Sequence, residues 1–319
     1  FTQVNGVARA RIARLMPTGV LDPEFDPGTG AARSVDAFAL VTGGDVIVGG
    51  TFLAINDIGR NRIARMSGGT GAPALLVQVK AHLGGYFDQG TNLMQDQLRA
   101  AALLPLSEPY TSLGYMHVGG GGEQITAPVL STTGTNAIVD WVVLELRGAS
   151  SPYPVIASRS ALVQRDGDLV DVDGVSPVGV SAPVGNYRVA IRHRNHLGAM
   201  TATTVALSGT PTVVDLTSPA TATFGTNARK AVGSTMVLWP GDATGNGQLR
   251  YTGSGNDRDP ILVVVGSTTP NNTVPNIYDR RDTNLDGVIK YTGSVNDRDI
   301  ILTNVGSTTP NNTRTQQLP

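Results

Sequence analysis

The feature that most constrains this chain is a unit of 32 residues, Asp242 to Thr273, which recurs 40 residues later as Asp282 to Thr313. The two copies share the segments YTGS, NDRD, IL and VGSTTPNNT almost letter for letter. Each copy opens with a loop rich in oxygen-bearing side chains, DATGNGQL in the first and DTNLDGVI in the second. This duplication predicts two similar structural units, each built on the same loop.

The spacing of the oxygen-bearing residues predicts a calcium site in each loop. Ca²⁺ takes about six to eight oxygen ligands, and side chains at alternate positions before a turning glycine converge on one point. The predicted ligands of the first loop are Asp242, Thr244, Asn246 and the backbone carbonyl of Gln248, and those of the second are Asp282, Asn284, Asp286 and the carbonyl of Val288. Gly247 and Gly287 stand at the turns.

The carboxylate that closes each loop comes late in the sequence. Position 12 of a standard calcium loop holds a carboxylate, but Gly253 and Gly293 stand there. We interpret YTGS as an insertion that delays the closing residue. The candidates are Asp257 or Asp259 in the first loop and Asp297 or Asp299 in the second, and the sequence leaves the choice open.

Each loop is predicted to lead into a short helix. Asn256 resembles a helix N-cap, with Asp259 three residues on and Pro260 in the first turn. The second loop has more candidate carboxylates than the first, so we expect it to bind calcium more tightly. The alternative is that these acidic side chains only cap helices and shape turns.

This duplicated region resembles dockerin modules, in which two loop-helix units pack with approximate two-fold symmetry. The resemblance covers residues 242–313 and implies Ca²⁺ as a cofactor. YTGS and the late NDRD depart from the dockerin pattern, so a cohesin partner is not carried over.

Composition limits the function classes. At 319 residues, with 40% hydrophobic and 15% charged residues, we expect two or three globular domains. A net charge of −1 gives no electrostatic reason to bind nucleic acid, and no apolar run is long enough to span a bilayer. Cysteine is absent, so no disulfide stabilises the fold.

A second, weaker repeat opens the chain. FTQVNGVARARIARL at 1–15 aligns with FLAINDIGRNRIARM at 52–66, and strands are predicted at 34–41 and 45–52 around a Gly43-Gly44 hairpin. This region resembles the delta-60 repeat of large secreted bacterial proteins in its segments RIARL, PGTG and VGGTF and in the turn at 22–25. The resemblance implies a propeller-like blade.

Since the chain starts partway through a period, we expect a segment before Phe1. One such unit has open edges, so its partner is either another chain, with RARIARL as a candidate exchanged strand, or the next domain.

The central region, residues 72–235, is predicted to be an antiparallel β-sandwich. Apolar residues alternate with polar ones at 75–83, 138–146 and 187–192, and further strands are expected at 155–164, 203–208 and 212–216. A helix is predicted at 92–104, ending before Pro105. The predicted domains are therefore a blade unit at 1–71, the sandwich at 72–235 and the calcium-binding repeats at 236–319.

Three clusters in the sandwich have catalytic or metal-binding residue types. Glu145 and Arg147 share a strand face and suit an ion pair, and we interpret His193 in RHRNH as structural. Asp166, Asp168, Asp171 and Asp173 lie in an acidic hairpin, for which we favour a solvated turn over a third calcium site. No nucleophile, base and catalytic metal converge, so we predict that the chain is not an enzyme.

The phrases WVVLELR, SALVQRDGDLVDVDG and YRVAIRHRNHLGAMT resemble a haemagglutinin-like domain of large secreted Gram-negative surface proteins. This resemblance implies an extracellular or cell-surface location. The segment STTPNNT occurs twice and places glycosylation sequons at Asn271 and Asn311.

The sequence therefore predicts a mainly β extracellular structural protein with a blade-like repeat, a central sandwich and calcium-stabilised loops. We expect it to self-associate into an oligomer or a fibre-like assembly, held by calcium and by strand exchange. The alternative is a monomeric adhesin or carbohydrate-binding module, for which Trp141 and Trp239 are the aromatic candidates.

Overall fold

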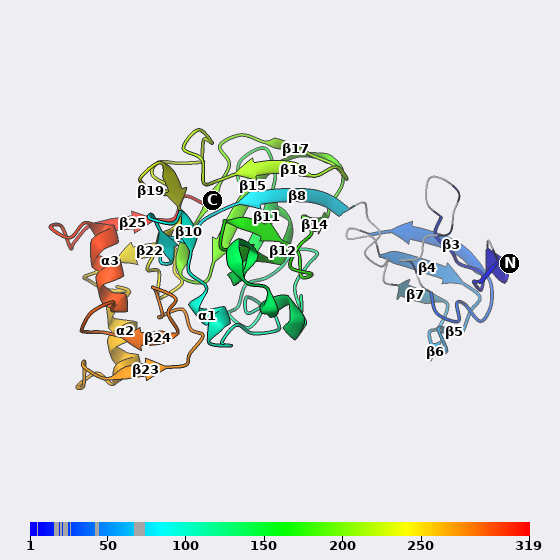
Figure 1. Ribbon diagram of the computed structural model, residues 1–319. Coiled ribbons are helices and arrows are strands. Elements are labelled where there is room, and N and C mark those ends of the chain that lie inside the picture. The colour runs from blue at the N-terminus through cyan, green and yellow to red at the C-terminus, as the bar shows by residue number, and fades with distance from the viewer. Residues whose placement is uncertain are drawn as a thin grey trace. The chain divides into compact units, whose positions relative to one another are not determined.

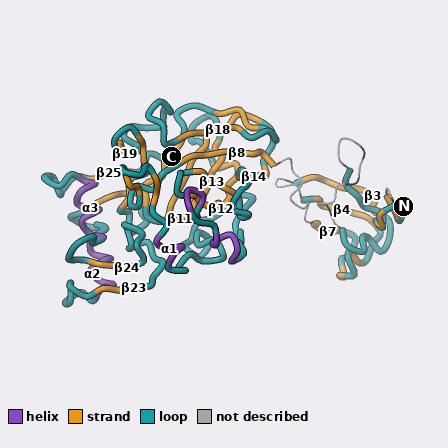
Figure 2. The backbone as a smooth tube through the Cα atoms, viewed as in Figure 1, coloured by secondary structure: helices purple, strands orange, loops and turns teal. Residues whose placement is uncertain are grey.

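The computed structural model describes residues 1–4, 6–15, 19, 21, 25, 27–41, 45–66 and 74–319. The chain divides into two compact units, Phe1–Leu75 with Ser181–Val184, and Leu76–Val180 with Gly185–Pro319. Strands dominate both units, and helices are few and short (Figure 2). The mainly β prediction is confirmed.

The first unit is built on a three-stranded antiparallel sheet in the order β3-β4-β7, with two small hairpins. Its strands are β1 (Gln3–Val4), β2 (Val7–Ala8), β3 (Val35–Leu40), β4 (Val46–Gly50), β5 (Ala54–Ile55), β6 (Ile58–Gly59) and β7 (Ile63–Met66). The core consists of buried side chains from the sheet and from the segments around it, including Phe25, Val48 and Phe52. Strands β3 and β4 confirm the predicted pair, whereas the predicted Gly43-Gly44 turn lies outside the described residues.

The N-terminal repeat is visible in the structure. Hairpin β1–β2 pairs Val4 with Val7, and hairpin β5–β6 pairs Ile55 with Ile58 at the equivalent positions of the second copy. The copies then differ, because residues 63–66 form β7 on the sheet while residues 12–14 belong to no strand. Leu15 makes only an isolated bridge to Leu21.

The second unit contains one hydrogen-bonded network of ten strands in the order β14-β8-β13-β12-β11-β15-β16-β21, with β17 beside β15 and β18 beside β8 (Figure 1). The strands are β8 (Ala74–Lys80), β11 (Ile138–Arg147), β12 (Val155–Gln164), β13 (Asp168–Val170), β14 (Val178–Ser181), β15 (Gly185–His193), β16 (His196–Met200), β17 (Val205–Leu207), β18 (Thr212–Asp215) and β21 (Trp239–Pro240). Pairings with a described register are antiparallel, except that β18 runs parallel to β8. Strand β11 is buried at every position, so both faces of the sheet are covered there.

Shorter elements surround the sheet. They are β9 (Phe87–Asp88), β10 (Leu93–Met94), α1 (Gln97–Ala100), the 3₁₀ helices η1 (Ala127–Ser131) and η2 (Gly134–Asn136), β19 (Lys230–Val232) and β20 (Thr235–Val237). The long helix predicted at 92–104 is wrong. Met94 pairs with Phe87 in the β9–β10 hairpin, and Ala102 adopts a left-handed φ of 55°, so tertiary pairing and a turn leave only one short helix.

The C-terminal repeats form two similar strand-helix units, with β22 (Gln248–Arg250) and α2 (Arg258–Val265) in the first and β24 (Val288–Lys290) and α3 (Asp297–Val305) in the second. The pairing is crosswise, because β22 pairs with β25 (Thr313–Thr315) and β24 pairs with β23 (Thr273–Pro275). Both predicted helices are confirmed. They contact each other at one end of the second unit (Figure 1). In the described part of the chain, no helix has the length and apolar character needed to cross a membrane.

Candidate metal centres

Each candidate loop turns at the predicted glycine before entering its strand. Gly247 has a φ of 75° and Gly287 a φ of 79°. This left-handed region costs glycine no steric strain, whereas a Cβ there would be strained. Both loops therefore turn at the sixth position, as the spacing predicted.

The first aspartate of each loop accepts hydrogen bonds from the loop backbone. The carboxylate of Asp242 accepts from the N–H groups of residues 245, 246 and 247 at 2.7 to 3.0 Å. The carboxylate of Asp282 accepts from the N–H groups of Asp286 and Gly287, at 3.0 and 2.9 Å. Each loop thus wraps around its first carboxylate.

Asp257 and Asp297 lie inside the loops. The carboxylate of Asp257 accepts hydrogen bonds from the backbone N–H groups of Thr244, at 3.0 Å, and Arg250, at 2.8 Å. In the second loop, the carboxylate of Asp297 accepts from the backbone N–H groups of Thr283, at 2.7 Å, and Lys290, at 2.8 Å. Each of these carboxylates joins the beginning of its loop to the strand at its end.

Asp259 and Asp299 point away from the loops. Asp259 forms an ion pair with Arg258 at 3.2 Å, and Asp299 forms one with Arg298 at 3.0 Å, with the acidic side chains about half exposed. Asn296 accepts a hydrogen bond from the backbone N–H of Asp299 at 2.9 Å and donates to its carboxylate. The structure therefore gives these two residues a helix-capping geometry and leaves Asp257 and Asp297 at the loops.

The other predicted ligands line the loops. The Asn246 side chain accepts a hydrogen bond from the backbone N–H of Gln248 at 2.8 Å. The Asp286 side chain accepts one from the backbone N–H of Val288 at the same distance. The Thr244 hydroxyl donates to Asp257 at 2.9 Å, and the Asn284 amide donates to Asp286 at 3.1 Å.

The loops concentrate buried negative charge. Asp242 is 4% exposed, and Asp257, Asp282 and Asp297 are fully buried. Burial, together with the nearby Asp242, raises the pKa of Asp257 to about 7, and burial together with Asp282 raises the pKa of Asp297 to about 8. Within the described residues, none of these four carboxylates forms an ion pair with a basic side chain.

This donor set fits a hard divalent cation. Carboxylate, amide and backbone carbonyl oxygens are the ligands that Ca²⁺ takes, and a cation between two buried carboxylates would offset the cost of burying their charges and the repulsion between them. The second loop brings three carboxylates together, Asp282, Asp286 and Asp297, and the first brings two, Asp242 and Asp257.

The YTGS insertion has a structural role. The Thr252 hydroxyl in the first copy donates to the amide oxygen of Asn311 in the second copy at 2.7 Å. The Thr292 hydroxyl donates to Asn271 at 2.8 Å in the reciprocal contact. YTGS and PNN therefore connect the two repeats crosswise, and the two sequon asparagines remain exposed.

The repeats are anchored to the large sheet by buried polar groups. The Asn195 side-chain amide donates to the backbone oxygen of Asp282 at 2.7 Å, and the Asn195 backbone oxygen accepts from the backbone N–H of Asp242 at 3.0 Å. The Tyr278 hydroxyl donates to Asp140 at 2.7 Å. Burial alone would raise the pKa of Asp140, but Arg194 and His193 lower it to about 2. Both loops thus contact the β15–β16 hairpin, a connection that the sequence did not indicate.

The three clusters weighed from sequence are held by structural contacts. Glu145 pairs with Arg147 within β11 at 2.6 Å and with Arg192 of the neighbouring strand β15 at 2.5 Å. His193 and His196 meet across the β15–β16 hairpin, with their Nδ1 atoms 2.9 Å apart. In the acidic hairpin, Asp171 pairs with Arg159 and Asp168 with Lys80, so these carboxylates have separate partners.

Sequence reasoning missed one cluster in the glycine-rich segment. Ligand atoms of Glu108, His117 and Glu123 lie within 4.8 Å of one another, beside the hydroxyl of Ser160. Glu108 already accepts hydrogen bonds from backbone N–H groups, including that of Tyr110 at 2.7 Å. The signal in the sequence was the pair of acidic residues flanking a histidine between turn-forming residues.

The two tryptophans are buried. Trp141 is 0% and Trp239 9% exposed, and the Arg314 guanidinium covers the Trp239 ring at 3.7 Å from its centroid. Neither ring offers an open platform for a sugar.

The comparisons with known proteins reach only the start of the chain. Residues 1–25 match the family described as domain of unknown function (DUF5122) beta-propeller. This match and the strand content define a β-rich repeat protein. No curated protein and no solved structure matches the chain.

Proposed function

We propose that this chain is an extracellular structural protein, a subunit of a surface or fibre-like assembly whose C-terminal repeat pair is stabilised by calcium. The observation that carries the calcium part is the pair of buried, facing aspartates in each loop, Asp242 with Asp257 and Asp282 with Asp297. A cation that binds these native loops and not the unfolded chain stabilises the fold by mass action. The dockerin-like and haemagglutinin-like resemblances support the same role and an extracellular location.

The assembly part rests on the open edge of the first unit. Strand β3 is at one end of the sheet order β3-β4-β7, and its Phe38 and Leu40 side chains are both 72% exposed. Of the eighteen large hydrophobic side chains exposed in the described residues, eight lie in residues 1–66. An unpaired strand edge with exposed apolar side chains favours addition of a strand from another chain.

Residues 9–15, the segment RARIARL, are the candidate strand for that edge. In the second copy of the repeat the residues equivalent to 12–15 form β7, whereas residues 12–14 form no strand here. Strand exchange between copies of the chain would give these residues a sheet to join. Head-to-tail contacts of this kind generate filaments when they do not close into a ring.

Sedimentation velocity tests the proposal, with the full chain in millimolar calcium and again after chelation. We expect large species in calcium. The double variant Phe38→Lys/Leu40→Lys removes the apolar edge and should shift the protein to a monomer, because charges on an edge strand oppose pairing. The matched control is Val175→Lys/Val213→Lys, which changes exposed valines elsewhere and should leave the large species intact.

A compact wild-type monomer in both buffers would contradict the assembly and would favour the monomeric adhesin. If the large species survive chelation, strand exchange holds the subunits, and calcium serves only the fold.

Glycans on Asn271 and Asn311 are also part of the proposal, since both side chains are exposed. Mass spectrometry of the natively produced protein detects them directly.

A further inference from the structure

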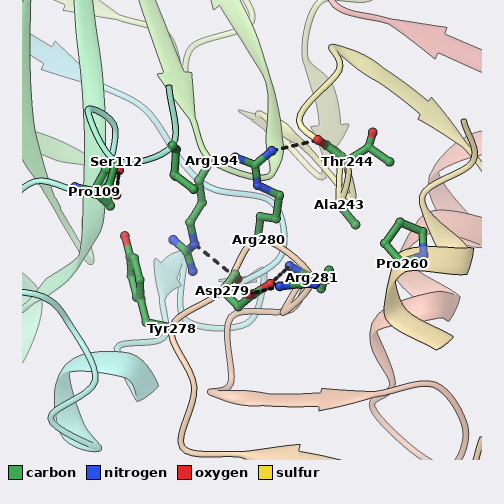
Figure 3. A pocket seen from close by; sticks show the side chains of 11 residues that line it. Pro109, Ser112, Arg194, Ala243, Thr244, Pro260, Tyr278, Asp279, Arg280 and Arg281 are labelled. Atoms are coloured by element: carbon green, nitrogen blue, oxygen red, sulfur yellow. Dashed lines mark hydrogen bonds and ion pairs between the residues drawn. The ribbon is translucent and has the colours of Figure 1, made fainter. Parts of the chain in front are cut away.

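A cavity of about 540 Å³ lies where the β15–β16 hairpin meets the C-terminal repeats. Figure 3 shows its wall, in which Arg194 comes from the hairpin, Thr244 from the first loop, and Tyr278 to Arg281 from the segment before the second loop. Three guanidinium groups and one carboxylate, that of Asp279, line it. The wall is therefore rich in positive charge.

One of these guanidinium groups has no acidic partner. Arg281 pairs with Asp279 at 2.6 Å, and Arg194 pairs with the buried Asp140. Arg280 donates to the backbone oxygen of Thr244 at 2.8 Å, and no carboxylate within the described residues pairs with it. Arg280 thus leaves one uncompensated positive charge at the cavity.

Arg194 contributes an unsatisfied donor. Its side chain is 1% exposed, its guanidinium stacks on the Tyr278 ring at 4.1 Å, and its Nε donates to the backbone oxygen of Asp279. Its Nη2 is buried and has no hydrogen-bond acceptor in the part of the chain that the structure describes. A buried guanidinium donor without an acceptor is costly, and an oxyanion in the cavity would satisfy it.

We propose that this cavity binds a carboxylate or sulfate group carried by a small polar organic molecule such as an acidic sugar. Guanidinium groups match planar and tetrahedral oxyanions with paired donors, and here Arg280 and the Nη2 of Arg194 supply them. The volume lies in the range of small-molecule sites, about 300 to 1,000 Å³, and exceeds what an inorganic ion needs. Ser112 and Thr244 line the remaining space, with apolar surface from Pro109 and Pro260.

Neither arginine is a candidate calcium ligand, so this site goes beyond the proposed function. The ligand contacts guanidinium groups, and it needs no stacking on an exposed tryptophan. Its binding should weaken as salt rises, because the interaction is between charges.

Isothermal titration calorimetry of the full chain in calcium buffer tests the site with three probes: glucuronate, glucose 6-sulfate and neutral glucose. We expect both anionic sugars to bind and glucose not to bind. The anionic sugar that binds with the higher affinity shows whether the site prefers a carboxylate or a sulfate. Arg280→Gln should weaken binding of the anionic sugars at least about tenfold. Arg280→Lys keeps the charge but loses the planar guanidinium, so its affinity should lie between those of wild type and Arg280→Gln.

Arg298→Gln is the matched control, because Arg298 lies outside the cavity and pairs with Asp299. It should leave the affinity unchanged. Thermal melts establish that each variant is folded. Equal affinities of wild type and Arg280→Gln, or no heat from either anionic sugar with folded wild type, would overturn the proposal.

Discussion

One buried side chain, Asp297, holds the two ends of the second loop together. It is fully buried and accepts backbone hydrogen bonds from both ends of the loop, and burial beside Asp282 raises its pKa to about 8. In the absence of a cation this carboxylate is under electrostatic strain, whereas bound calcium would stabilise it.

We therefore predict opposite effects of Asp297→Asn in two buffers. In calcium the variant should melt at a lower temperature than wild type, with affinity at this loop reduced about tenfold or more, because a charged ligand is lost. In chelator it should melt at the same temperature or higher, because a buried repulsion is removed. Scanning calorimetry in both buffers measures the two effects.

Asp299→Asn is the control for this prediction. The Asp299 carboxylate accepts a hydrogen bond from the N-cap residue Asn296 and is half exposed, so its loss should cost about 0.5 to 1 kcal/mol equally in both buffers. A calcium-dependent loss at Asp299 with none at Asp297 would reverse the assignment of the closing residue.

Acid should destabilise the protein through His82. Burial, with the nearby Lys80, lowers the pKa of His82 to about 4, against the attraction of Asp215 and Asp168. Between about pH 6.5 and 4 the unfolded chain binds a proton that folded His82 does not, so the free energy of unfolding decreases as the pH falls through this window.

The His82→Gln variant isolates this effect. Its free energy of unfolding should fall less than that of wild type below pH 6.5, by up to about 1 kcal/mol per pH unit. Urea unfolding at pH 7.5 and 5, in the same calcium buffer, measures the difference. If the free energies of unfolding of wild type and His82→Gln fell equally between these pH values, His82 would not contribute to the acid destabilisation.

At the scale of elements, the two loops differ in charge. The second contains three carboxylates and the first contains two, so we predict that the second loop fills first, with affinity higher by about an order of magnitude. Calcium titrations of Asp257→Asn and Asp297→Asn test this, since the first variant should retain the tighter site and the second the weaker one. The reverse order would contradict the carboxylate count.

Local patterns predicted the elements whose stability is local. The alternation at 138–146 and the strand expected at 155–164 became β11 and β12, and Asn256 and Asn296 mark the starts of α2 and α3. The segment 92–104 failed because Met94 is drawn into a hairpin with Phe87, a contact that helical propensity does not report. The choice of Asp257 over Asp259 also depends on tertiary structure, since both follow YTGS and only burial separates them.

At the scale of the whole molecule, the C-terminal repeats and the large sheet belong to one compact unit. The apolar core of the repeats includes Leu197 and Trp239 from the sheet strands β16 and β21, and Asn195 contacts both loops. We predict that calcium shifts the unfolding of the sheet and the repeats together.

The two tryptophans allow this to be measured. Trp141 lies in the sheet core and Trp239 in the core of the repeats, and the chain contains no other tryptophan. Trp239→Phe and Trp141→Phe each leave one fluorescent reporter, and within each variant the reporter should show the same calcium-dependent shift in melting temperature. A shift at Trp239 alone would mean that the repeats unfold independently.

The sequence predicted a mainly β chain with a duplicated loop-helix region, because both follow from periodicity and spacing. It did not predict that the β15–β16 hairpin joins the two loops, or that Arg194 and Arg280 meet at one cavity. Residues 194 and 280 are far apart in sequence, so only the folded chain brings them together.

Calcium binding by the loops is the central claim, and isothermal titration calorimetry of the chelator-stripped full chain tests it most directly. We predict saturable binding of one calcium ion in each loop by wild type, and loss of binding in the folded double variant Asp257→Asn/Asp297→Asn. Absence of binding by folded wild type, or undiminished binding by the double variant, would contradict the account.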